Sequence, residues 1–180
     1  MAIKPVIYKF IISLSDLELN YYDTLKLTVA QHPSETPERM MARVLALCLN
    51  ASALPRFTKG LSEPDEPDII AHSLDGQMTL WIDVGEPALE RIKKATRIAS
   101  NVKVYSFNSK SSVWWQQNKN SFQALQVAVY RLDWDAIKTL AAGVQRTMEM
   151  SLTISGDSLY VASEHDNCEI KCNPLQINLN

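Results

Sequence analysis

The sequence contains no long apolar run and only three cysteines. No stretch approaches the roughly 20 apolar residues that a membrane-spanning helix requires, so we expect no membrane association. Cys168 and Cys172 are separated by three residues, which is not the spacing of a zinc clip, and no second pair exists. We expect no signal peptide, because the apolar run near the N-terminus is not sustained and no small-residue cleavage site follows it. We therefore expect a reducing cytoplasmic location.

An excess of basic residues is also missing. The chain has 18 Lys and Arg residues and 20 Asp and Glu residues, which gives a formal net charge of −2. This is not the broad positive surface of a protein that coats nucleic acid. A nuclease of this charge would need a local basic patch or a bridging cation. The length of 180 residues and the 46% hydrophobic content predict one soluble domain over residues 1–180.

Alternating apolar residues predict two N-terminal strands, over residues 2–17 and 19–30, which we expect to pair antiparallel. Helix-start signals follow, with Ser34 or Thr36 as the cap and Pro37 in the first turn. Apolar residues then recur at helical spacing, at Met41, Val44, Leu45, Cys48 and Leu49. This pattern predicts a helix with one strongly apolar face.

The middle of the chain predicts a right-handed parallel unit, with a strand over 78–84, a helix over 88–100 and a strand over 102–107. The remaining patterns predict a short strand over 56–61, a helix over 109–118, a strand over 124–132, a helix over 133–145, and hairpin strands over 148–154, 159–162 and 168–172. We therefore expect an α/β fold with a mixed central sheet, flanking helices and additional antiparallel hairpins from both termini.

Carboxylates gather around the strand at 78–84. Asp65 and Asp68 lie in a proline-containing loop before it, and Asp83 lies near its end. Glu38 lies beside the apolar stripe of the first helix, so its carboxylate is expected to be paired, bound to a metal or placed at the open N-terminal end of the helix, where a negative charge is favourable. Two or three carboxylates suffice for Mg²⁺, which keeps several water ligands. If these acids converge at one sheet edge, they would hold a Mg²⁺ ion that serves phosphodiester hydrolysis.

Two basic residues could serve the same site. Arg91 and Lys94 lie one turn apart on the helix that follows Asp83, and either side chain could stabilise charge at a scissile phosphate. The alternative for every one of these residues is structural. Acids in proline-containing loops are commonly turn or cap residues, and lysines on a helix are commonly solvated. Taken singly, each residue fits the structural explanation better.

The sequence resembles the YaeQ family of bacterial proteins over nearly the whole chain. The stretches that carry the resemblance are HPSETPERMMARVLA, FTKGLSEPDEPD, LWIDVGEP, RIKKA, VYSFN, WWQQN and RTM. The resemblance implies a variant of the PD-(D/E)XK nuclease fold, the fold of many restriction endonucleases. It also implies Glu38 as the helix acid, Asp68 as the acid after proline with Asp65 as the alternative, and Asp83 as the strand acid.

The sequence departs from the nuclease pattern two residues after Asp83. Gly85 stands where a lysine is expected, so Lys94 or Arg91 would have to replace that lysine. We therefore expect either a Mg²⁺-dependent nuclease or phosphodiesterase acting on nucleic acid, or a non-catalytic binding or regulatory protein that keeps the nuclease scaffold. A site for a small acidic or phosphorylated ligand is the third possibility.

Overall fold

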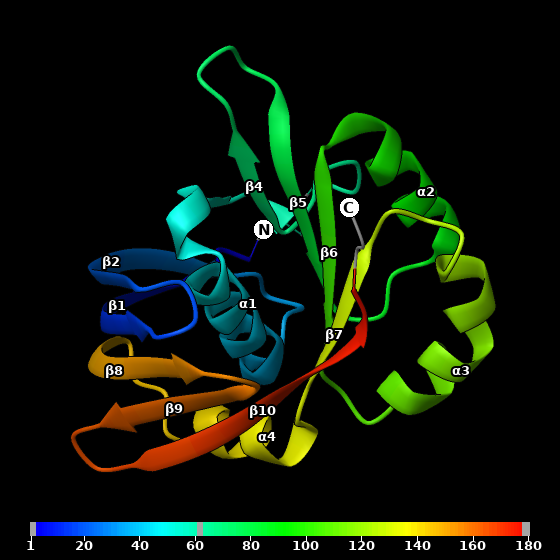
Figure 1. Ribbon diagram of the computed structural model, residues 1–180. Coiled ribbons are helices and arrows are strands. Elements are labelled where there is room, and N and C mark those ends of the chain that lie inside the picture. Colours follow the sequence, from blue (N-terminus) through cyan, green and yellow to red (C-terminus); the bar gives the residue numbers. More distant parts are fainter. Residues whose placement is uncertain (1–2, 61–62, 178–180) are drawn as a thin grey trace.

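The computed structural model describes residues 3–60 and 63–177, and within them ten strands form one continuous mixed sheet (Figure 1). The strand order is β2-β1-β8-β9-β10-β7-β6-β5-β4-β3. The elements are β1 (Val6–Asp16), β2 (Tyr21–Gln31), α1 (Pro37–Leu49), η1 (Ala51–Ala53), β3 (Arg56–Phe57), β4 (Ile69–His72), β5 (Met78–Val84), α2 (Leu89–Ile98), β6 (Asn101–Ser106), α3 (Ser111–Phe122), β7 (Ala128–Leu132), α4 (Trp134–Ala142), β8 (Thr147–Ser155), β9 (Ser158–Ser163) and β10 (Asn167–Gln176).

The predicted parallel unit is confirmed. Strands β5 and β6 pair in parallel and are joined by α2, and β7 continues the parallel pairing after α3. Helices α2 and α3 cover one face of these strands (Figure 1). Ile92 and Ala95 of α2 and Phe122 of α3 are fully buried in the core on that side, where apolar burial stabilises the packing.

The hairpins at the two ends of the chain are also confirmed, but they join in a way that the sequence does not predict. Strands β1 and β2 pair antiparallel, as do β8 with β9 and β9 with β10. Strand β1 also pairs in parallel with β8, and β10 pairs with both β9 and β7. The hairpins therefore belong to the same sheet as the parallel unit, and β10 connects the two parts (Figure 1, red).

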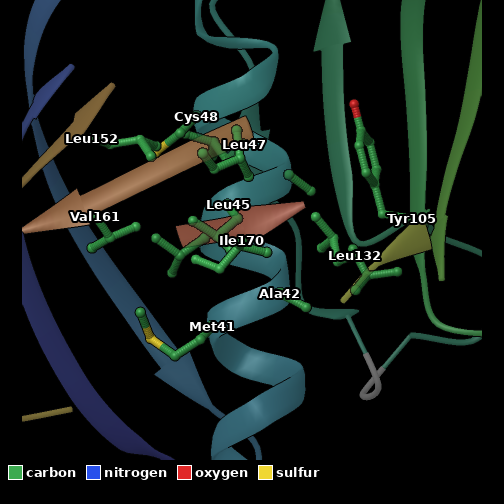
Figure 2. Close-up of a cluster of buried hydrophobic side chains, with 14 of the residues drawn as sticks. Met41, Ala42, Leu45, Leu47, Cys48, Tyr105, Leu132, Leu152, Val161 and Ile170 are labelled. Atoms are coloured by element: carbon green, nitrogen blue, oxygen red, sulfur yellow. The ribbon is translucent and has the colours of Figure 1, made fainter. Parts of the chain in front are cut away.

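Helix α1 lies on the concave side of this sheet (Figure 1). Thr36 caps it, since its hydroxyl accepts a hydrogen bond from the Arg39 amide at 3.2 Å, and Pro37 occupies the first turn as predicted. All nine residues from Met40 to Cys48 are buried, so the helix is covered on every side and not only on its predicted face. Figure 2 shows Leu45 and Cys48 near side chains of β8, β9 and β10, with Leu132 and Tyr105 on the other side.

Several element boundaries differ from the sequence prediction. Helix α3 extends to Phe122 and β7 begins only at Ala128, because residues 123–127 form a turn where a strand was expected. The expected strand over 56–61 is limited to β3, and residue 61, like residue 2 of the first predicted strand, lies outside the described residues. Strand β4 at residues 69–72 is not predicted by the sequence patterns. Among the described helices, none has the length and apolar content to span a membrane.

Candidate active site

Asp68 and Asp83 are brought together by the pairing of β4 with β5. Ile69 pairs with Ile82 in this antiparallel ladder, so the same register places Asp68 opposite Asp83. The Asp68 amide donates to the Ile82 carbonyl oxygen at 3.0 Å, which extends the ladder to this position. Side chains directly opposite one another in antiparallel strands lie on the same face, and like charges there repel. The two carboxylates therefore need compensating positive charge.

Arg39 of α1 supplies this charge to Asp68, whose side chain is only 8% exposed. The guanidinium Nη2 donates to Asp68 Oδ1 at 2.7 Å and to the Val84 carbonyl oxygen at 3.3 Å. The other Asp68 oxygen accepts from the Val84 amide at 2.8 Å. Burial alone would lower the pKa of Arg39, but Asp68 and Glu35 raise it above its ordinary value. Arg39 therefore stays charged and fixes the Asp68 carboxylate at the end of β5.

Arg91 of α2 compensates Asp83 in the same way. Its Nε donates to Asp83 Oδ2 at 2.7 Å and its Nη2 to Oδ1 at 3.0 Å, which is a bidentate pair. The guanidinium also donates to the carbonyl oxygens of Pro64 and Glu66 and lies over the Trp81 ring. Burial raises the pKa of Asp83, Arg91 opposes this, and Asp68 adds to the increase. Arg91 therefore links Asp83 to the acidic loop, which is formed by residues 63–68.

A buried ion-pair network with Glu35 and Arg43 holds the Arg39 guanidinium in place. Glu35, whose side chain is 1% exposed, accepts from Arg39 Nη1 at 2.6 Å and from Arg43 Nη2 and Nε at 2.6 and 2.8 Å. Arg43 also donates to the Ala30 carbonyl oxygen. The sequence analysis did not identify Arg39 or Arg43. The spacing of four residues between Arg39 and Arg43 was the available signal, because such side chains share one face of a helix, and Glu35 lies just before that helix.

Asp68 and Asp83 line one cleft of about 350 Å³ between the acidic loop, the end of β5 and the start of α2. Its lining carries more acidic than basic side chains. The five carboxylates are Glu63, Glu66, Asp68, Asp83 and Glu86, and the two guanidinium groups are Arg39 and Arg91. The cleft therefore favours cations over anions unless a further positive charge is bound.

The structure separates the two candidates for the acid after proline. The Asp65 side chain is 91% exposed and its carboxylate lies 3.3 Å from Lys94 Nζ, at the rim of the loop. Asp68, by contrast, is buried opposite Asp83. Lys94, which is 59% exposed, therefore pairs with the outer acid, and Arg91 is the basic residue that reaches the strand acid.

Glu38 does not join this pair. Arg39 faces Asp68, and neighbouring residues on a helix point about 100° apart, so Glu38 is directed elsewhere. It is half-buried and has no ion pair in the part of the chain that the structure describes. Over residues 3–60 and 63–177, no three His, Cys, Asp or Glu side chains are grouped as metal ligands. The expected convergence of Glu38 with both aspartates is therefore not formed.

The remaining donors still match the chemistry of Mg²⁺, which is commonly bound by one or two carboxylates, several waters and substrate phosphate oxygens. Asp68 and Asp83 provide two carboxylates that lie opposite one another on paired segments and line the same cleft. Gly85, which replaces the expected lysine, has φ +120° and open space where a side chain would begin. The basic groups in the cleft are thus arginines from α1 and α2.

Glu86 gives a prediction about stability and pH. Burial raises its pKa, although Phe107 and Asn108 favour the charged form. Because the folded pKa exceeds the unfolded value, the ionised side chain destabilises the fold above the folded pKa, and the effect vanishes below about pH 4. We expect Glu86→Gln to raise the melting temperature by about 1–3 °C at pH 8.

The same comparison at pH 4 should show almost no difference between Glu86→Gln and the unchanged protein. Glu164→Gln is the control, because its carboxylate is 87% exposed. Circular dichroism melts at both pH values measure the effect. A gain that is larger at pH 4 than at pH 8 would contradict a raised pKa of the Glu86 carboxyl group.

Comparison with known proteins identifies the family. A sequence model of the YaeQ protein family matches residues 1–172. The chain is 37% identical to the uncharacterized protein YaeQ of Salmonella typhi and 36% identical to that of Escherichia coli (strain K12), each over 178 residues and 98% of both chains. The crystal structure of the YaeQ protein from Xanthomonas axonopodis pv. citri superposes with a TM-score of 0.92 at 31% identity, covering 96% of this chain and 99% of that one.

The YaeQ protein from Pseudomonas syringae superposes with a TM-score of 0.90 at 30% identity, covering 96% of each chain. The family match spans both aspartates of the cleft, and the two solved structures share the arrangement of helices and strands. The chain therefore belongs to the YaeQ family.

Proposed function

We propose that the protein is a Mg²⁺-dependent phosphodiester hydrolase of the bacterial cytoplasm that acts on nucleic acid through a scaffold related to the PD-(D/E)XK nucleases. The observation that carries the proposal is the pair of buried carboxylates, Asp68 and Asp83, opposite one another on adjacent strands and open to one cleft. Two negative charges at opposite positions of adjacent strands repel one another and destabilise the fold. Such arrangements are typical of sites that bind a cation.

The charge of the cleft supports a requirement for a cation. Five carboxylates against two arginines oppose the binding of a phosphate group, so a bound cation would strengthen substrate binding. When bound, Mg²⁺ stabilises charge on the phosphate and activates a water molecule. Asp68 and Asp83 are the residues that would hold it.

Arg39 and Arg91 are the second part of the proposed site. The side chains of Arg39 and Arg91 are 18% and 31% exposed, so each guanidinium is open to the cleft while it holds its carboxylate. Guanidinium groups bind phosphate oxygens with paired hydrogen bonds. We assign to both arginines the binding of the substrate phosphate. They would take the role of the lysine that the nuclease pattern has at the position of Gly85. The cation and the arginines would then act on the same phosphate group.

The alternative is a non-catalytic nucleic-acid-binding or regulatory protein. One observation favours it: all four oxygens of the Asp68 and Asp83 carboxylates already accept hydrogen bonds from arginine or from the Val84 amide. If these ion pairs are permanent, the arginines replace the cation and no water is activated. The two functions differ in whether the protein binds a divalent cation.

A cleavage assay combined with a cation titration tests the proposal. We expect the purified protein to cut single-stranded or double-stranded DNA or RNA with Mg²⁺ or Mn²⁺ and not with EDTA, and to bind the cation in calorimetry. Lys94→Ala should leave cation binding unchanged and slow cleavage by only a few fold, because Lys94 lies at the rim. Absence of both cation binding and cleavage would leave the binding protein as the better explanation.

A further inference from the structure

A second pocket adjoins the cleft and is not used by the proposed hydrolysis. It has a volume of about 710 Å³ and lies where the parallel strands β5 and β6 end, beside α3. It shares Arg39, Val84 and Glu86 with the cleft, so the two are neighbours. The carboxyl ends of parallel strands are a common place for ligands, and this volume is in the range of roughly 300–1,000 Å³ for small-molecule sites.

One wall of the pocket is aromatic and fixed. Trp114 of α3 donates its indole N–H to the Pro87 carbonyl oxygen at 3.1 Å. Its ring packs against Phe122 and Trp115, with centroids 5.4 and 6.0 Å away. Neighbouring Val113 is 57% exposed at the same pocket. A ring held in this way presents a rigid apolar surface, and such surfaces bind the flat face of a nucleobase.

Gly85 lines the pocket with bare backbone. Its φ of +120° is a conformation that side-chain-bearing residues rarely adopt, and among the described residues other than its two chain neighbours no heavy atom lies within 4 Å of where a Cβ would be. The Gly85 amide donates to the Tyr105 carbonyl oxygen at 2.8 Å, which fixes this conformation. The residue that replaces the expected lysine thus leaves room for a ligand to approach the backbone.

Glu86 provides a polar group with unused capacity. Its Oε2 atom is buried and has no hydrogen-bond partner within the described residues. A carboxylate short of donors is unfavourable in a partly buried site, and a ligand that donates N–H groups to it relieves this cost. The terminal torsion of a glutamate is soft, so either oxygen can be turned toward such a donor. Asn108 and Lys110 supply further polar groups at the same pocket.

From these observations we infer that the Trp114 pocket, defined by Gly85, Glu86, Val113, Trp114 and Gln117, binds a nucleobase that carries an amino group. The base packs against Trp114 and donates its amino hydrogens to Glu86. The inference rests on the proposed function, because it places the base beside the phosphodiester that occupies the cleft. Adenine, cytosine and guanine carry the amino group, and uracil does not.

Nucleotide binding without metal tests the inference. The full chain is titrated calorimetrically in EDTA with AMP, CMP, GMP and UMP, and separately with single-stranded DNA trimers, which distinguish free nucleotides from nucleic acid as the source of the base. The four nucleotides carry the same phosphate, so its repulsion by the cleft carboxylates weakens all four equally and the comparison among them reports the base. We expect the amino-bearing nucleotides to bind at least about tenfold more tightly than UMP. Glu86→Gln should remove that preference, since an amide both donates and accepts hydrogen bonds.

A matched pair of variants controls for the location. Gln117 and Gln116 are both exposed on α3, but only Gln117 lines the pocket. We expect Gln117→Trp to obstruct the pocket and weaken binding at least about tenfold, and Gln116→Trp to leave it unchanged. Equal binding of UMP and the amino-bearing nucleotides, or equal binding by both tryptophan variants, would overturn the inference.

The outcomes are separable from those of the proposed function. Metal-dependent cleavage with no effect of Gln117→Trp on nucleotide binding would reject the Trp114 pocket and leave the hydrolase intact. Nucleotide binding as predicted, without any cation binding or cleavage, would reject the hydrolase and leave a base-binding protein.

Discussion

Replacing Glu35 with alanine is expected to lower the free energy of unfolding by about 3–5 kcal/mol, the usual cost of removing one partner of a buried ion pair. Glu35 is 1% exposed and holds two guanidinium groups, Arg39 and Arg43, with side-chain exposures of 18% and 5%. Without the carboxylate, Arg43 would be buried with an uncompensated charge. Urea denaturation followed by circular dichroism measures the loss.

The matched control is an exposed ion pair. Lys138 and Asp135 lie 3.1 Å apart with side chains 48% and 87% exposed, and Asp135→Asn should change stability by no more than about 1 kcal/mol. A double variant, Glu35→Leu with Arg43→Leu, should recover part of the loss, because apolar side chains remove the unpaired charge. A loss below about 1 kcal/mol for Glu35→Ala would show that water or a rearranged arginine compensates at this site.

The Asp83→Asn variant is expected to lose metal-dependent cleavage by at least about 100-fold and to weaken cation binding, if the protein is the hydrolase proposed above. Asparagine keeps the shape of the side chain and one acceptor for Arg91 but removes the negative charge. It also removes the repulsion between Asp83 and Asp68 that raises the Asp83 pKa. The fold should therefore remain stable, and a melting curve checks this.

Asp65→Asn is the control for Asp83→Asn. Both changes remove one carboxylate charge from the same region, but Asp65 is 91% exposed and does not line the cleft. We expect it to keep cation binding and most of the cleavage rate. Equal, metal-independent activity in the unchanged protein and in Asp83→Asn would indicate a contaminating nuclease and would contradict the hydrolase.

The parts of the fold that follow from local patterns could be predicted from the sequence. The alternation of residues 78–84 and 102–107 around an amphipathic helix was sufficient for the parallel unit, because these contacts are close in sequence. The pairing of β1 with β8 could not be predicted, because local patterns do not specify the partner of a strand more than 100 residues away. The same reason applies to β10, which has two different partners.

Only part of the candidate site could be predicted from the sequence, because local patterns reveal strand ends but not the pairing of distant segments. Asp83 follows from its position near a strand end, whereas the choice of Asp68 over Asp65 depends on the register of a short strand that the sequence pattern does not reveal. The importance of Arg39 depends on α1 being enclosed by the sheet, since on an exposed helix its ion pair would be ordinary. Tertiary packing, rather than residue type, gives these charges their role.

The parallel register of β1 with β8 has a consequence for synthesis on the ribosome. Strand β1 ends at residue 16, but its partner begins at residue 147, so this pairing must wait until most of the chain has emerged. The strand that joins both parts of the sheet, β10, is made after all the other described strands. During this interval, the apolar residues of α1 lack their final cover. Nascent chains are therefore exposed to aggregation and to chaperones between the synthesis of α1 and that of β10.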